Sequence, residues 1–186
     1  MRTTLSGIIA VAALALSGQA LAADAAAQKA ELQKMCDDAL ATLYKEKPAV
    51  KAEVAKSAGY GCFSSFGISF FVGGAGGRGL VHDNATKKTT YMNMAQASGG
   101  LDFGIKDYRE VLVFKDKATL TQFVTKGWEF GGGGGAQAKA GGKGANAGGT
   151  EISSSQIEVY PMTKTGLAIG VAAAARKYWK DDDLNK

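Results

Sequence analysis

Apolar residues recur at helical spacing between Asp24 and Tyr44. The apolar stripe consists of Leu32, Met35, Cys36, Ala39, Leu40 and Leu43, with Glu31, Lys34, Asp37 and Asp38 on the opposite side. This pattern predicts an amphipathic helix with one face buried. Lys45 to Pro48 interrupts the helix, and Pro48 fits the first turn of a second, shorter helix that ends at Gly59. The apolar line of the second helix consists of Val50, Val54 and Ala58.

After Gly59 the helical spacing gives way to β-branched, aromatic and small residues, which predict strands. The predicted strands lie at residues 60–72, 80–81 and 89–92, and in two hairpins that pair 95–105 with 109–114 and 156–160 with 167–178. Gly73 to Gly79 predicts a turn or a bulge, and Asp83–Asn84 predicts a second turn.

Between the hairpins, the sequence predicts a short helix that is capped by Asp116 and stopped by Gly127. Its apolar face consists of Leu120, Phe123 and Val124. Gly131 to Gly149 holds ten glycines in 19 residues, and indicates either a loop or strands packed too closely for side chains. Together the elements predict an α+β fold, in which an N-terminal helical pair packs on a curved, mostly antiparallel, barrel-like β-sheet.

The first 22 residues have the pattern of a cleavable secretory signal peptide. Arg2 supplies a basic start, Leu5 to Leu16 is an apolar run, and Ala20 to Ala22 places small residues at the cleavage site. The apolar run is too short to span a bilayer. We therefore expect a mature protein that is periplasmic or secreted, at the periphery of a membrane.

The remaining chain divides into an N-terminal helical region (23–58) and a glycine-rich, β-dominated domain (59–186), which we expect to form one globular unit. Removing residues 1–22 takes away Arg2 and lowers the formal net charge from +5 to +4. This mildly basic balance suits contact with anionic surfaces, and outside the cytoplasm we expect no nucleic-acid partner.

Two glycine-rich stretches resemble nucleotide-binding motifs. Gly74 to Gly79 matches G-x-G-x-x-G, but strand and turn residues follow where a dinucleotide site needs a helix. Gly141 to Gly144 lacks the Ser or Thr and the spacing of a phosphate loop. We interpret the glycines as allowing bends and close approach of strands. Such turns can also hold an anion, with Arg78, Lys139 and Lys143 adding positive charge.

The chain has two cysteines, Cys36 and Cys62, and one histidine, His82. An oxidising compartment favours a disulfide, whereas the apolar surroundings of both cysteines also fit two buried thiols. Cys62 and His82 would be the pair for a cysteine hydrolase, but no predicted helix N-terminus lowers the pKa of Cys62. Three such ligands cannot close a zinc site, and we expect no metal, cofactor or catalytic residue. Asp181 to Asp183 is expected to be a solvated run.

Four stretches between Ala55 and the C-terminus share an order and spacing with a known family. They are Ala55–Tyr60, Phe71–Val81, Gly100–Gly104 with Val111–Phe114, and Phe130–Gly144 with Lys164–Val171. These stretches resemble the opening, the glycine-studded segment, the V-L-V block and the closing pattern of the SYLF family, also called the Ysc84 actin-binding domain family. Where that family usually reads A-G-P-x-G, the chain has the looser and more basic Ala140 to Gly144.

The resemblance implies lipid binding, with phosphoinositide recognition in eukaryotic members and actin binding in some fungal ones. For an exported protein we expect a non-enzymatic partner of anionic phospholipid or phosphoinositide headgroups at a membrane surface, and we do not expect actin. The alternatives are the hydrolase that would use Cys62 and His82 and a structural protein of the cell envelope. The basic residues expected to contact lipid are Lys45, Lys47, Lys51, Lys56, Arg78, Lys87 and Lys88.

Overall fold

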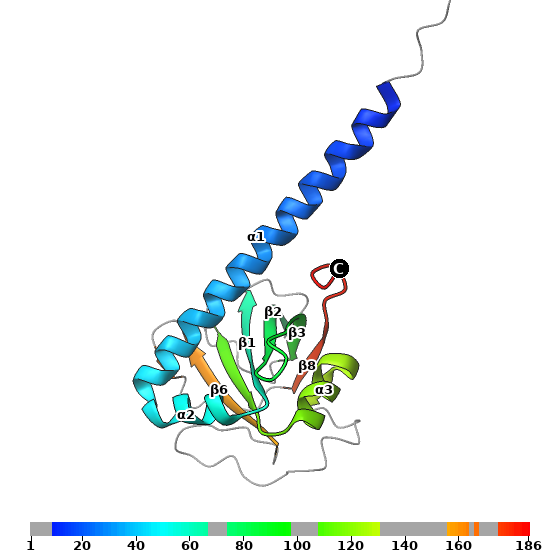
Figure 1. Cartoon of the computed structure of the whole chain (residues 1–186). Coiled ribbons are helices and arrows are strands. Elements are labelled where there is room, and N and C mark those ends of the chain that lie inside the picture. Colours follow the sequence, from blue (N-terminus) through cyan, green and yellow to red (C-terminus); the bar gives the residue numbers. More distant parts are fainter. Residues whose placement is uncertain (1–8, 67–73, 98–107, 131–155, 164–165, 168–174) are drawn as a thin grey trace, which may run out of the picture.

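The computed structural model describes residues 9–66, 74–97, 108–130, 156–163, 166–167 and 175–186 (Figure 1). Side chains are described from residue 24 onward, except at residues 66, 74–75 and 97. The glycine-rich stretch 131–149, including Lys139 and Lys143, lies outside the described residues. The helices are α1 (Ile9–Glu46), α2 (Pro48–Lys56) and α3 (Lys117–Lys126). The strands are β1 (Gly59–Phe66), β2 (Gly74–Asp83), β3 (Thr89–Ala97), β4 (Arg109–Phe114), β5 (Trp128–Phe130), β6 (Ile157–Thr163), β7 (Gly166–Leu167) and β8 (Ala175–Lys180).

The predicted helices are confirmed. The α1 stripe from Leu32 to Leu43 is buried apart from the half-buried Met35, and the charged residues opposite it face solvent. α1 begins at Ile9 and therefore continues through the segment expected to be a signal peptide, whose alanines and leucines favour helix. The Asp116 side chain accepts a hydrogen bond from Thr119 N (2.8 Å) at the start of α3, and Gly127 ends that helix with a φ of 77°.

The strands form one eight-stranded antiparallel sheet in the order β5-β8-β3-β2-β1-β4-β6-β7. In Figure 1 the sheet is curled into a half-barrel, and α1 and α2 lie together on one of its faces. This arrangement confirms the predicted α+β fold, with N-terminal helices packed on a curved antiparallel sheet.

The predicted hairpin between 95–105 and 109–114 is wrong for the residues that the structure describes. Ala95 to Ala97 belong to β3, which pairs with β2 and β8, whereas β4 pairs with β1 and β6. At the second hairpin the chain does reverse, but Met162, expected in the turn, is the residue that pairs with Leu167. β8 pairs with β3 and β5, and residues 157–160 pair with β4. Alternation of side chains tells which face a residue occupies and does not tell which strand lies next to it.

The predicted turn or bulge at Gly73 to Gly79 is also wrong, because Gly74 to Gly79 form the first part of β2. These glycines allow close approach to β1. A Cβ atom on Gly77 would lie 2.5 Å from the Ser64 carbonyl oxygen, and one on Gly79 would lie 2.2 Å from that of Cys62. A larger residue at either position would push the two strands apart.

The sheet separates two hydrophobic clusters. On the helix-bearing face, the α1 and α2 stripes pack against Cys62, Leu80 and Val111. On the opposite, inner face, α3 contributes Leu120 and Phe123 to an aromatic cluster. The aromatic members of this inner cluster are Phe63, Phe114, Phe123, Phe130 and Tyr178. α1 and α2 are thus fixed on the outside of the half-barrel.

Candidate functional site

The two cysteines are joined by a disulfide. Cys36 of α1 and Cys62 of β1 are fully buried, with their Cα atoms 5.2 Å apart. The cysteine hydrolase considered from the sequence is therefore wrong, because the sulfur that would act as nucleophile is already bonded. His82 packs against Tyr60 with the two rings tilted and their centroids 5.2 Å apart. Burial together with the neighbouring Lys87 lowers the pKa of His82.

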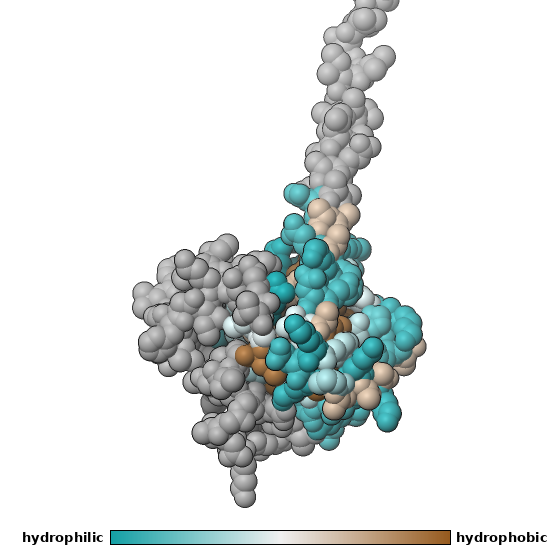
Figure 2. Space-filling model, turned by 90° about the vertical axis from the view of Figure 1, so that its left-hand side faces the viewer, coloured by the Kyte–Doolittle hydropathy of each residue, from teal (hydrophilic) through white to brown (hydrophobic). Residues whose placement is uncertain are grey.

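Several of the predicted basic residues gather where α1 meets α2. Lys45 lies in the last turn of α1, and Lys51 and Lys56 belong to α2; all three side chains are exposed. The outward side of α2 between these lysines carries small apolar residues. They are Pro48, Ala49, Ala52 and Ala55. Figure 2, which views the molecule from this side, shows that hydrophilic residues cover most of its described surface.

Lys47 differs from its neighbours because it contacts the sheet. Its ammonium lies 5.2 Å from the centre of the Tyr160 ring, and the Tyr160 hydroxyl lies 2.9 Å from Glu158 Oε2. Lys115 forms an ion pair with Glu158. Burial by itself raises the pKa of Glu158, but hydrogen bonds from Lys115 and Tyr160 hold it below its ordinary value. Lys47 therefore belongs to a network that attaches α2 to β6.

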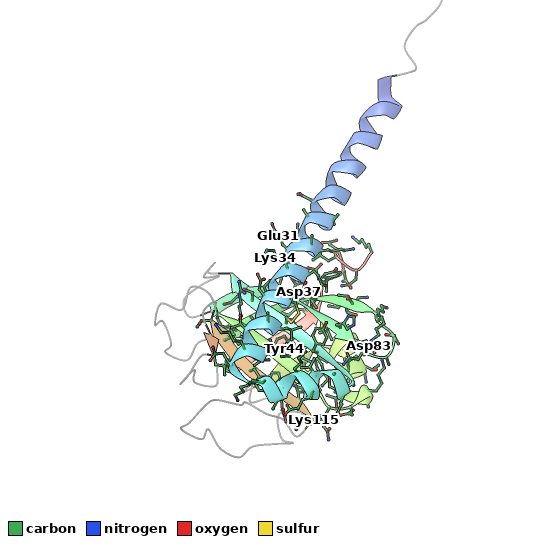
Figure 3. All side chains as sticks on the ribbon, turned by 60° about the vertical axis from the view of Figure 1, so that its left-hand side comes forward. Glu31, Lys34, Asp37, Tyr44, Asp83 and Lys115 are labelled. Atoms are coloured by element: carbon green, nitrogen blue, oxygen red, sulfur yellow. A yellow bond between two sulfur atoms is a disulfide. The ribbon has the colours of Figure 1, made fainter. Side chains whose placement is uncertain are left out.

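The turn between β2 and β3 brings two more lysines to the same end of the molecule. Lys87 and Lys88 are exposed, and their turn is bonded to α2 through Asn84. We call Lys45, Lys47, Lys51, Lys56, Lys87 and Lys88 the lysine-rich end. Figure 3 shows Lys115 and Asp83 near α2, and Glu31 and Lys34 further along α1.

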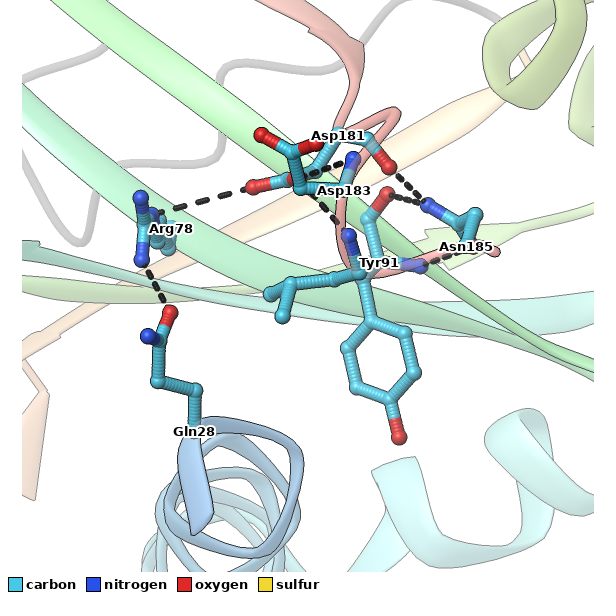
Figure 4. Close-up of polar contacts among 7 residues, drawn as sticks. Gln28, Arg78, Tyr91, Asp181, Asp183 and Asn185 are labelled. Atoms are coloured by element: carbon cyan, nitrogen blue, oxygen red, sulfur yellow. Dashed lines mark hydrogen bonds and ion pairs between the residues drawn. The ribbon is translucent and has the colours of Figure 1, made fainter. Parts of the chain in front are cut away.

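Arg78, predicted to act with these lysines, lies in the middle of β2 and contacts other groups. Its guanidinium donates to Gln28 of α1, and its Nε lies 3.8 Å from Asp181 Oδ2 (Figure 4). Asp181 is 5% exposed, so the expectation of a fully solvated acidic run at Asp181 to Asp183 is wrong at its first residue. The Asp181 carboxylate accepts hydrogen bonds from two backbone N–H groups of the C-terminal turn. Asn185 binds this turn to β3, because its side-chain Nδ2 donates to the Tyr91 carbonyl oxygen. Arg78 thus links β2 to α1 and to the C-terminal turn.

The part of α1 that carries Gln28 has the opposite charge to the lysine-rich end. Asp24, Glu31, Asp37 and Asp38 are exposed along it, and Lys34 forms an ion pair with Asp38 at 2.9 Å. The balance of charge therefore differs along the helix-bearing face: lysines outnumber the exposed Glu46 and Glu53 at one end, and acidic residues outnumber Lys29 and Lys34 at the other. An anionic surface would be attracted to one end and repelled by the other.

The sequence reasoning missed a buried polar network on the inner face of the sheet. Arg176 Nη1 lies 2.8 Å from Glu110 Oε2, and both side chains are fully buried. The hydroxyl groups of Tyr108 and Tyr178 donate to the two Glu110 oxygens. Burial raises the pKa of both tyrosines well above the ordinary value, with the Glu110 charge adding to it, so both hydroxyls stay protonated donors. The available signal was Glu110, which directly precedes the apolar run Val111–Phe114 of β4.

Asn84, Lys115 and Lys117 were also missed. Lys117, at the start of α3, forms an ion pair with Asp83 at the end of β2. This hydrogen bond to Lys117 is the main reason that the pKa of Asp83 lies well below its ordinary value. None of these contacts joins residues that are neighbours in sequence, so only the fold reveals them.

Of the helices in the described part of the chain, none combines the length and the apolar character needed to cross a bilayer. Within the same residues, no group of three or more His, Cys, Asp and Glu side chains is arranged to hold a metal ion.

Comparison with known proteins gives two matches. Residues 95–186 match the Ysc84 family, described as Las17-binding protein actin regulator. Beta cell expansion factor A of Aeromonas veronii is 33% identical over 158 residues, which cover 83% of this chain and 58% of that protein. The chain therefore spans little more than half the length of this relative. On the match over residues 95–186, the chain belongs to the Ysc84 family, whose domain is also called the SYLF domain.

Proposed function

We propose that this protein binds lipid without enzymatic activity, docking its lysine-rich end on membranes that contain anionic phospholipids. The observation that carries the proposal is the gathering of exposed lysines from α1, α2 and the β2–β3 turn at one end of the molecule. Membership of the Ysc84 family and the difference in the balance of charge along the helix-bearing face support it.

The expected strength follows from the number of exposed lysines. Lys45, Lys51, Lys56, Lys87 and Lys88 are exposed, and each basic residue near an anionic leaflet contributes about 1 kcal/mol. Their sum of about 5 kcal/mol corresponds to a Kd of roughly 0.2 mM. The small apolar side of α2 between Lys51 and Lys56 adds a modest contribution if it enters the interface. The proposal is thus a weak, reversible and salt-sensitive association.

We also propose that residues 1–22 are removed as a signal peptide and that the mature protein works in the periplasm or outside the cell. The Cys36–Cys62 disulfide supports this location, because such bonds persist in oxidising compartments. Mass spectrometry of the protein recovered from its native host tests the cleavage. A mature N-terminus at Ala23 supports it, and an intact Met1 contradicts it.

Reversing charge at the lysine-rich end should abolish binding to anionic vesicles. The Lys51→Glu/Lys56→Glu variant exchanges two attractive contacts for two repulsive ones, so we expect affinity to fall by at least about 25-fold. Co-sedimentation with phosphatidylglycerol-containing vesicles and with pure phosphatidylcholine vesicles measures this. Binding of the unchanged protein should be measurable at about 50 mM salt and lost at about 0.5 M.

The matched control is Lys34→Glu/Lys177→Glu, which makes the same change in net charge. Lys34 and Lys177 are exposed and lie outside the lysine-rich end, in ion pairs with Asp38 and Glu129. This control should keep most of the binding. Equal losses in the two variants would show that net charge alone matters, and would contradict the proposed surface.

A further inference from the structure

Asn84 joins the β2–β3 turn to the C-terminal end of α2. Its side-chain Nδ2 donates to the carbonyl oxygens of Val54 (2.7 Å) and Ser57 (3.0 Å). Its backbone N–H donates to the carbonyl oxygen of Ala58 at 3.0 Å. The last carbonyls of a helix have no partner within the helix. Here the Asn84 side chain binds the carbonyls of Val54 and Ser57, and shares the Val54 carbonyl with the Ser57 hydroxyl, which donates to it at 2.8 Å. Lys56, the last residue of α2, lies between the two carbonyls that the Asn84 side chain binds.

The turn itself is held in one conformation from its other side. Asp83 accepts hydrogen bonds from the backbone N–H groups of Ala85 (3.0 Å) and Thr86 (3.2 Å), and forms its ion pair with Lys117 of α3. The Lys87 N–H donates to the Asp83 carbonyl oxygen at 2.8 Å, and Lys87 has a φ of 59°. A turn fixed to both α2 and α3 keeps Lys87 and Lys88 in a constant position relative to Lys56.

We propose that Asn84 is the positioning residue of the lysine-rich end, and that the surface it prepares fits a membrane on which several anionic headgroups lie side by side. This inference rests on the proposed function. Asn84 carries no charge and need not touch lipid. It acts by holding lysines from two elements so that they meet one anionic surface together, which lowers the ordering cost of binding.

The inference predicts that a neutral substitution will weaken an electrostatic interaction. In Asn84→Ala the net charge is unchanged, but the turn loses its side-chain bonds to α2. If Lys87 and Lys88 no longer reach the surface with Lys56, affinity falls about fivefold for each lysine lost, or up to about 25-fold. Fewer lysines acting together should also reduce the slope of log affinity against log salt, a quantity that a purely structural role of Asn84 would leave unchanged.

The test compares three variants in the same vesicle assay, at a temperature where circular dichroism shows each of them folded. Asn93→Ala, at a half-buried position in β3, is the matched control and should bind like the unchanged protein. Asn84→Ser keeps one hydrogen-bond donor, so its affinity for anionic vesicles should lie between those of the unchanged protein and Asn84→Ala. This variant provides the test if Asn84→Ala does not fold. The inference is supported if the Asn84 variants bind more weakly and show a smaller slope of log affinity against log salt, while Asn93→Ala is unaffected.

The failures of the two proposals are distinct. If the unchanged protein ignores anionic vesicles at low salt, the proposed function fails and the inference fails with it. If the unchanged protein binds and the folded Asn84 variants bind equally well with the same salt slope, the inference alone is overturned.

Discussion

Replacing Glu110 by leucine is expected to destabilise the protein by about 3–5 kcal/mol, a large share of the stability of an ordinary domain. Glu110 and Arg176 are both fully excluded from solvent, with Glu110 Oε2 lying 2.8 Å from Arg176 Nη1. Without the carboxylate, the Arg176 guanidinium stays buried with its charge uncompensated. The Tyr108 and Tyr178 hydroxyls lose their acceptor as well. Urea unfolding followed by circular dichroism measures the change.

A double substitution distinguishes the effect on stability of removing the whole Glu110–Arg176 pair from the effect of removing Glu110 alone. In Glu110→Leu/Arg176→Met no unpaired charge remains, so this variant should be more stable than Glu110→Leu alone. The exposed pair of Glu129 and Lys177 is the control, and Glu129→Leu should change stability by less than about 1 kcal/mol. Destabilisation by Glu110→Leu of under about 1 kcal/mol, or simple additivity in the double variant, would contradict this account.

Removing the Cys36–Cys62 disulfide should cost about 3 kcal/mol of stability. The bond closes a loop between residues separated by 26 positions, and most of its effect comes from restricting the unfolded chain. Cys36→Ala/Cys62→Ala should therefore melt at a temperature lower by roughly 6–12 °C. Thermal unfolding measured with and without a reducing agent provides the check.

The reducing agent also supplies the control for this prediction. It should lower the melting temperature of the unchanged protein and leave that of the double-alanine variant where it is. Because α1 also packs through Leu32, Leu40 and Leu43, we expect the variant to keep its helix on the sheet. A variant as stable as the oxidised protein would show that packing alone determines the position of α1.

The sequence predicts those parts of the fold that depend on local spacing. The stripe from Leu32 to Leu43 reveals α1, and Asp116 with Gly127 delimits α3, because each signal lies within a few residues of its effect. Strand pairing does not follow from such signals. β3 has β2 and β8 as neighbours, and β8 lies far along the chain: the paired residues Asn93 and Trp179 are 86 positions apart.

The same distinction applies to the candidate site. Basic residues on and beside a short helix are evident in the sequence, and Lys51 and Lys56 are exposed as a lipid-contacting surface requires. Arg78 could not be separated from them, because its partner Asp181 lies far along the chain. Asn84 was read only as a turn residue, since its bonds to Val54 and Ser57 exist only in the folded protein.

The central claim is that the lysine-rich end faces the membrane, and chemical footprinting of the unchanged protein tests it most directly. Lysines are acetylated with a limiting reagent in the presence and absence of phosphatidylglycerol vesicles, and mass spectrometry measures the rate at each site. We predict that vesicles protect Lys45, Lys51, Lys56, Lys87 and Lys88, while Lys34 and Lys177 react at unchanged rates. Protection that is uniform over the surface, or concentrated at Lys34 and Lys177, would contradict the account.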